Sequence, residues 1–101
     1  MKYQIILSSE ANKDYAEYIN TIMYDYNAPL TAAKHYMGLY STLKSLETYP
    51  EIFQIQTRRS LSQYGTNVRR INYKKMAIIY TIHGDIVYIH RIIPTSMITG
   101  L

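Results

Sequence analysis

Residues 64–97 have the sequence YGTNVRRINYKKMAIIYTIHGDIVYIHRIIPTSM, and this stretch decides the fold of the chain. Apolar and polar residues alternate over Val68–Tyr73, whereas Met76–Ile82 is an almost continuous apolar run, and Ile86–Ile93 follows as the last strand. Alternation predicts a strand with one covered face, and a continuous run is typical of a central strand that is covered on both faces. Turns are expected at Lys74–Lys75 and at residues 83–85. The segment therefore predicts three consecutive strands of one sheet.

The first half of the chain carries two apolar stripes at helical spacing. Ser8–Ser9 can cap a helix that runs to about Tyr26, and residues 27–29, Asn-Ala-Pro, break it. A second helix begins near Thr31 and ends before Pro50, because the residue preceding a proline is pushed away from helical angles. The stripes are Ala11, Tyr15, Tyr18, Ile19, Ile22, Met23 and Tyr26, and then Ala32, Ala33, Tyr36, Leu39, Tyr40, Leu43 and Leu46. The acidic residues of the first helix, Glu10, Asp14, Glu17 and Asp25, fit a solvated face.

The remaining segments complete the order of elements. Tyr3, Ile5 and Leu7 alternate with their neighbours and predict a short first strand. Ile52–Gln56 is a weaker candidate for a strand, and Ser60–Asn67 is expected to be a loop. The order β-α-α-β-β-β predicts a single α+β domain, residues 1–101. The N-terminal strand joins a mainly antiparallel sheet, and the antiparallel helical hairpin packs on one face of that sheet.

The cations are concentrated in the second half. Residues 51–101 carry a net charge of +5, from seven Lys or Arg and two acidic residues, whereas residues 1–50 carry −1. This segregation predicts a face suited to an anionic partner. Arginine suits phosphate and carboxylate groups because its planar fork is always charged and binds bidentately. RNA, whose bases can stack on tyrosine rings, and an acidic protein segment both fit that description.

Composition argues against several other classes of protein. The sequence contains no cysteine, and His35, His83 and His90 share no metal-ligand spacing, so neither a metal nor another cofactor is expected. It has no phosphate-binding glycine loop, HExxH motif, calcium loop or nucleophile elbow. No apolar run approaches the roughly 20 residues that span a bilayer, and the N-terminus lacks a secretory signal. We therefore expect a cytoplasmic protein that does not bind membranes.

The order and spacing of the motifs resemble the RelE/ParE superfamily of type II toxin–antitoxin toxins. The matching segments are SSEANKDYAEYINTIMYDYN (8–27), AP (28–29), AAKHY (32–36), LKSLETYPE (43–51), GTNVRRINYKKMAIIY (65–80) and DIVYIHRIIPTSM (85–97). The resemblance covers nearly the whole chain. It implies the β-α-α-β-β-β fold with a concave sheet, a tightly bound antitoxin, and growth inhibition with plasmid stabilisation as the biological outcome.

The end of the last strand separates the two branches of the superfamily. RelE-like members cut mRNA in the ribosomal A site and use a C-terminal Arg, with His or Tyr; here that position falls on or near Thr95, and no His or Tyr follows. ParE-like members poison DNA gyrase and typically end with an Arg, two apolar residues, a His and a Ser-Met pair. Residues 91–97, Arg-Ile-Ile-Pro-Thr-Ser-Met, follow this pattern except that Pro94 replaces the His. The resemblance is therefore closer to the ParE branch.

The resemblance implies a ParE-like inhibitor of DNA gyrase that is not itself an enzyme. The residues expected to bind the target are Arg69, Arg70, Arg91, Ser96 and Met97. Two alternatives remain. A RelE-like, ribosome-dependent mRNA endonuclease would use Arg69, His90 and Arg91, and an inactive homologue would only bind the antitoxin.

An antitoxin is the partner that the resemblance implies. An acidic segment that folds on binding can place an amphipathic helix against the helical hairpin or add a strand at a sheet edge. Its expected anchors are Tyr15, Tyr18, Tyr36 and Tyr40, at least half of which should be in the core. A toxin–antitoxin hetero-oligomer, or a homodimer through the same surface, is the assembly expected.

Overall fold

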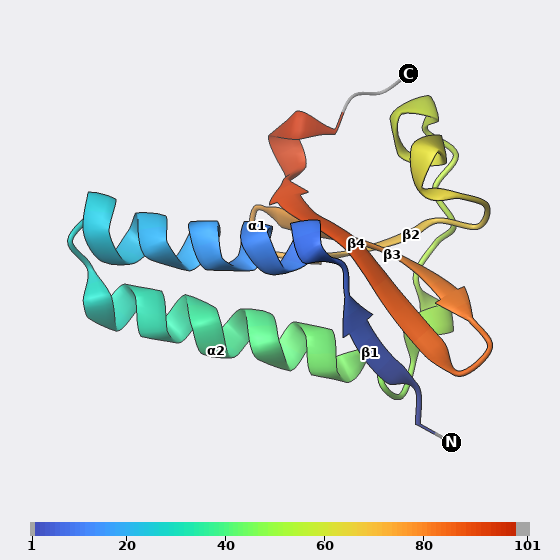
Figure 1. Ribbon diagram of the computed structural model, residues 1–101, viewed down its shortest axis with the longest axis horizontal. Coiled ribbons are helices and arrows are strands. Elements are labelled where there is room, and N and C mark those ends of the chain that lie inside the picture. The colour runs from blue at the N-terminus through green and yellow to red at the C-terminus, as the bar shows by residue number, and fades with distance from the viewer. Residues whose placement is uncertain (1, 99–101) are drawn as a thin grey trace.

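The alternating segments of the second half form strands as predicted. The structure, a computed structural model, describes residues 2–98 and contains a four-stranded sheet in the order β1-β4-β3-β2 (Figure 1). The strands are β1 (Gln4–Leu7), β2 (Arg69–Tyr73), β3 (Met76–His83) and β4 (Ile86–Pro94). β1 is parallel to β4, and the other neighbours are antiparallel. The predicted α+β fold with a mainly antiparallel sheet is confirmed.

Both predicted helices are present, with different ends. α1 (Ser9–Asn20) is capped by the Ser8 hydroxyl, and the chain continues as a π-helical turn, η1 (Thr21–Asp25), instead of an α-helix to Tyr26. The Tyr26 N–H donates to the Thr21 carbonyl at 3.2 Å, so this turn holds one residue more than an α-helical turn. α2 (Pro29–Ser45) begins at Pro29 and not at Thr31, since proline suits the first helical position. In residues 2–98 no helix is long and apolar enough to cross a membrane.

The helical hairpin covers one face of the sheet and buries the main core there (Figure 1). The buried residues of this cluster are Ala11, Leu39, Leu43, Leu46, Met76, Ile78, Tyr80, Val87, Ile89 and Ile92. A smaller cluster of Leu61, Val68, Ala77 and Ile79 covers part of the opposite face, with Tyr64 and Ile98 packed against it. Residues 76–81 of β3 are therefore buried on both faces, as their apolar run predicted. Leu61 and Tyr64 belong to a 3-10 helix, η3 (Arg59–Tyr64), within the segment predicted to be a loop.

The hairpin is held close to the sheet at Gly38 of α2. A β-carbon added there would collide with the hydroxyl and ring of Tyr73, which projects from β2. Tyr73 also makes an edge contact with the ring of His35, at 5.9 Å between centroids. Because Gly38 has no side chain, the Tyr73 ring can lie directly against the backbone of α2.

The weak strand predicted at Ile52–Gln56 is wrong. Pro50–Ile52 form a 3-10 turn, η2, and only Ile55 bridges to the sheet, opposite Arg69. The carbonyls of this turn serve as acceptors for side chains: Arg69 Nη1 donates to the Glu51 and Phe53 carbonyls at 2.9 and 2.6 Å. Tyr80 donates to the Pro50 carbonyl at 2.6 Å. Because these acceptors are taken, the segment cannot add a full strand beside β2.

Alkaline pH is expected to destabilise the fold through Tyr80. Its side chain is fully buried, and burial raises the pKa of its hydroxyl to about 12, although the charge of Arg69 lowers the pKa somewhat. The unfolded phenol ionises near pH 10, so its contribution to the free energy of unfolding is complete below pH 10 and is lost as the pH rises to 12. Two pKa units correspond to about 2–3 kcal/mol. Urea unfolding of the wild type and of Tyr80→Phe between pH 9 and 12 measures this; equal pH slopes would contradict it.

Candidate functional site

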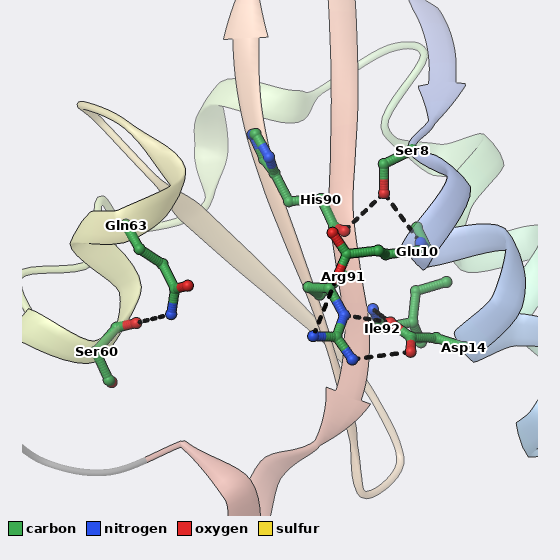
Figure 2. A network of polar contacts seen from close by, with 9 residues as sticks. Ser8, Glu10, Asp14, Ser60, Gln63, His90, Arg91 and Ile92 are labelled. Atoms are coloured by element: carbon green, nitrogen blue, oxygen red, sulfur yellow. Dashed lines mark hydrogen bonds and ion pairs between the residues drawn. The ribbon is translucent and has the colours of Figure 1, made fainter.

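The edge of β4 changes partner where β1 ends. β1 pairs with β4 as far as Leu7 and Ile89. Beyond that point the Ser8 N–H donates to the Ile89 carbonyl at 2.9 Å, and the Ser8 hydroxyl donates to the His90 carbonyl at 2.8 Å (Figure 2). The same hydroxyl oxygen accepts from the Ala11 N–H at 2.9 Å and caps α1. Ser8 therefore joins the start of the first helix to the last strand.

β4 carries one extra residue at this junction. Ile79 and Tyr80 are adjacent on β3 but lie opposite Arg91 and Ile89, so His90 is the extra residue of a β-bulge. A bulge bends its strand and redirects the side chains. Figure 2 shows that the side chains of His90 and Arg91 leave β4 in different directions.

Arg91 is bound by the carboxylate of Asp14 on α1 (Figure 2). Its Nε and Nη2 atoms donate to the two Asp14 oxygens at 2.7 and 3.0 Å, and Asp14 Oδ2 also accepts from the Ile92 N–H at 2.9 Å. Glu10 lies farther away, at 3.7 Å from Arg91 Nη1. The hydrogen bond to Asp14 raises the pKa of Arg91, and only 28% of this side chain is exposed. Arg91 consequently fastens the strand to the helix and leaves little of its guanidinium to a partner.

Thr81, His83 and His90 meet on the face of the sheet that the hairpin does not cover. The Thr81 hydroxyl lies 2.7 Å from His83 Nε2 and 2.8 Å from His90 Nε2. A hydroxyl donates only one proton, so at least one of the two rings carries a proton on Nε2. The His90 ring also contacts Tyr88 and Tyr64, at 4.8 and 5.3 Å between centroids. Burial, and then the nearby His83, lower the pKa of His90, which is therefore neutral at pH 7.

The structure does not bring together the three residues considered for an mRNA endonuclease. Arg69 lies on the helix-facing side of β2, where it holds the turn at residues 50–53. His90 lies on the uncovered face, and Arg91 turns to α1. Arg70, the neighbouring residue of β2, is half-buried opposite Ile79 on the uncovered face. Within residues 2–98, no group of three or more His, Cys, Asp or Glu side chains could hold a metal ion.

The chain turns sharply after β4. Pro94 ends the strand, as its ring predicts, and is followed by a 3-10 turn, η4 (Thr95–Met97). Ile98 then packs against the small cluster on the uncovered face. Ser96 and Met97 remain exposed, with 62% of Met97 accessible. The two residues expected to contact a target are thus on the surface.

A groove of about 570 Å³ lies between α1 and α2 beside β1. Tyr15, Tyr36 and Tyr40, three of the four tyrosines expected to anchor an antitoxin, line it. Tyr15 donates to the Tyr36 carbonyl at 3.0 Å, and the two rings lie 5.4 Å apart. Tyr36 and Tyr40 are half exposed, whereas Tyr15 packs against the core. The groove also includes Ile5 and Leu7 of β1, an edge strand of the sheet.

Tyr18, the fourth of these tyrosines, does not line the groove. It faces the other side of α1, where its hydroxyl lies 2.6 Å from His35 Nδ1. It lines a smaller hollow, of about 380 Å³, that also includes Arg91 and Met97. Tyr18 is therefore closer to the C-terminal turn than to the aromatic groove.

Sequence comparison assigns a family to this arrangement. The profile of the family described as ParE toxin of type II toxin-antitoxin system, parDE, matches residues 5–99. The chain belongs to the ParE toxin family. Among solved structures, the ParE-family chain is similar to one in the chromosomal ParDE TA system from P. aeruginosa, with a TM-score of 0.74 and 14% identity over 92% of this chain and 96% of that one. At this identity the likeness supports the fold alone. No curated protein matches the chain.

Family membership confirms the resemblance inferred from the motifs, and the ParE-family chain is a type II toxin by sequence. Sequence reasoning missed two residues that organise its C-terminal strand, Ser8 and Asp14. Asp14 was expected on a solvated face, but only 12% of its side chain is exposed. The available signal was its position one helical turn after Glu10, on the helix face that meets β4.

Proposed function

We propose that this ParE-family toxin inhibits DNA gyrase and is neutralised by an acidic antitoxin. The observation that carries the gyrase target is the sequence at the end of β4, Arg91 to Met97, together with the exposure of Ser96 and Met97 in the turn that follows. In this proposal Ser96 and Met97 contact the target directly. Arg70 adds a cation on the uncovered face, and Arg91 keeps the turn in place through Asp14. Arg69 has a structural role, because its guanidinium is bonded to backbone carbonyls.

Inhibition of purified gyrase tests the target. The toxin should block supercoiling of relaxed plasmid and leave cell-free translation intact. Met97→Asp should raise the half-inhibitory concentration by at least about tenfold, since a charge replaces an apolar contact. Met37→Asp is a matched control, because Met37 on α2 is equally exposed, at 62%. If translation is inhibited, mRNA is cleaved and supercoiling is unaffected, the target is the ribosome and not gyrase. If neither assay responds while the toxin still binds the antitoxin, the protein is an inactive homologue.

The aromatic groove is the site we propose for the antitoxin. An amphipathic helix can insert apolar side chains between Tyr36 and Tyr40, and the adjacent edge of β1 can accept an extended segment. Within residues 2–98 no strand pairs with the outer edge of β1. A segment that is disordered when free would gain both contacts as it folds. The toxin would then form a hetero-oligomer.

The double variant Tyr36→Ala/Tyr40→Ala is expected to weaken antitoxin binding by at least about 30-fold, since aromatic anchors in interface pockets contribute about 2 kcal/mol or more. Isothermal titration with the protein encoded by the adjacent reading frame measures this. Tyr24→Ala/Tyr26→Ala is the control pair, because these tyrosines are 71% and 75% exposed at the tip of the hairpin and do not line the groove. An equal loss of antitoxin affinity in the two double variants would show that the antitoxin binds elsewhere.

A further inference from the structure

The cations of the second half are gathered along one edge of the sheet. Residues 52–84 contain six Lys or Arg and no acidic residue. Five of the six lie on β2, in the turn that follows it, or on η3, and one of these five, Arg69, is bonded to backbone carbonyls; the side chains of the other four form no such bond in the described part of the chain. These four, the β2 cation strip, are Arg59, Arg70, Lys74 and Lys75. β2 is the edge strand opposite β1, so the strip and the aromatic groove lie at opposite edges of the sheet.

No acidic group neutralises the strip within the described residues 2–98. Both ion pairs found there involve Arg91. Arg59, Lys74 and Lys75 are exposed, and Arg70 is half-buried. Lys74 lies over the Tyr73 ring, at 5.8 Å from its centroid, and none of the four cations forms an ion pair within residues 2–98, so the strip presents positive charge to an anion.

The spacing of the strip suits a repeating anion. From Arg70 to Tyr73, the last residue of β2, the strand advances about 10 Å, at about 3.3 Å per residue, and Lys74 follows in the turn. One strand of a nucleic acid carries a phosphate about every 3.4 Å along the helix axis, so this length spans about four phosphates. An acidic protein segment that folds on binding would need apolar surface to bury, and the groove that offers it lies at the other edge of the sheet.

Aromatic rings lie on the uncovered face of the sheet, on which Arg70 also lies. Tyr64 from η3 and Tyr88 from β4 both contact the neutral ring of His90. Tyr64 belongs to the same 3-10 helix as Arg59, and Tyr88 lies beside Thr81 of β3. Half-exposed rings near a cationic groove or edge are the surface on which unpaired bases stack.

We infer that the β2 cation strip binds the phosphodiester backbone of a nucleic acid, with Tyr64 and Tyr88 on the uncovered face of the same sheet to receive unpaired bases. The strip thus gives the toxin a second kind of partner, which is distinct from the antitoxin and from the proposed protein target. If gyrase is that target, the DNA it holds is the nucleic acid within reach. The binding itself requires neither gyrase nor antitoxin.

Fluorescence anisotropy with labelled 20-nucleotide probes tests the inference on the intact toxin. Single-stranded DNA, single-stranded RNA and duplex DNA of one sequence are titrated between 50 and 200 mM salt. Four neutralised phosphates predict a slope of about −3 for log K against log salt on a single strand. Lys74→Gln/Lys75→Gln should reduce the slope by about 1.4 and weaken binding at 0.1 M salt by about 25-fold. The source of the phosphates follows from which probe binds most tightly.

The control removes the same charge from the helices. Lys13→Gln/Lys34→Gln alters two exposed lysines outside the strip and should change affinity less than about twofold. Equal losses in the two double variants would overturn the inference, because binding would then reflect net charge alone. Salt-independent binding, no binding of any probe at 50 mM salt, or tighter binding of a polyglutamate peptide of matched charge would also overturn it. A failure to inhibit gyrase would leave these measurements unaffected.

Discussion

Asp14→Ala is expected to lower the free energy of unfolding by about 2–4 kcal/mol, the largest effect of any single substitution on the surface of α1. The change removes both hydrogen bonds of the Arg91 guanidinium and the acceptor of the Ile92 N–H. The Ile92 N–H is then left without its acceptor, and the partly buried guanidinium keeps the longer ion pair with Glu10 but loses its closest partner; groups of this kind cost about 1–3 kcal/mol each when unsatisfied. Urea denaturation followed by circular dichroism measures the loss.

Two further variants distinguish the loss of the bidentate contact from the loss of a negative charge near Arg91. Glu10→Ala removes the acid that lies 3.7 Å from Arg91 and is 72% exposed, and should cost less than about 0.5 kcal/mol. Asp14→Asn keeps one acceptor oxygen and should fall between the two. If Asp14→Ala costs no more than Glu10→Ala, the link between α1 and β4 does not contribute to stability.

Gly38→Ala is expected to destabilise the fold by about 1–3 kcal/mol, although the same change in an exposed helix interior normally stabilises by about 0.5–1 kcal/mol. The reason is the contact with Tyr73, whose hydroxyl and ring occupy the space of the new methyl group. To accept it, α2 must move away from β2 or the tyrosine must leave its position. Thermal and urea unfolding both report the change.

A double-mutant cycle assigns the effect of Gly38→Ala to this contact. Tyr73→Phe removes the hydroxyl, the atom nearest to the added methyl group, so Gly38→Ala should cost less in the Tyr73→Phe background. Full additivity of the two changes would show that the strain arises elsewhere in α2. Gly65→Ala is not a suitable control, because the φ angle of Gly65 is +116° and any side chain is strained there.

The elements with a regular pattern were predictable from the sequence. Alternation at Val68–Tyr73 and the apolar run at Met76–Ile82 each identified a strand, because side chains of a strand alternate between its faces. The Ser8 cap and Pro29 located the starts of the helices within about two residues. These signals are local, so one sequence is enough to detect them.

The features that a single sequence did not show depend on distant partners. Ile52–Gln56 has a strand-like composition, but Arg69 and Tyr80 take the carbonyls of the preceding turn. The bulge at His90 follows from the way that β1 ends and α1 begins, which alternation within β4 cannot indicate.

The candidate site was predictable only in part, because some of its residues are bound by partners that are distant in the sequence. The tail residues Ser96 and Met97 and three of the four tyrosines lie on surfaces where a partner could reach them. Arg69 and Arg91 are half-buried, and each guanidinium is bound within the fold. From the sequence alone, Arg69 and Arg91 are indistinguishable from free cations, because the sequence does not show which acceptors surround each guanidinium.

The parallel pairing of β1 with β4 has a consequence for synthesis on the ribosome. Gln4 lies opposite Ile86, so the first strand waits for its partner until most of the chain has been made, roughly 4 to 16 s at usual elongation rates. During that time β1 has no neighbouring strand, and the apolar side of α1 has no sheet to pack against. The bonds from Asp14 to Arg91 and Ile92 form later still. A nascent chain that stops before Arg91 therefore lacks the contacts that fasten the last strand to α1.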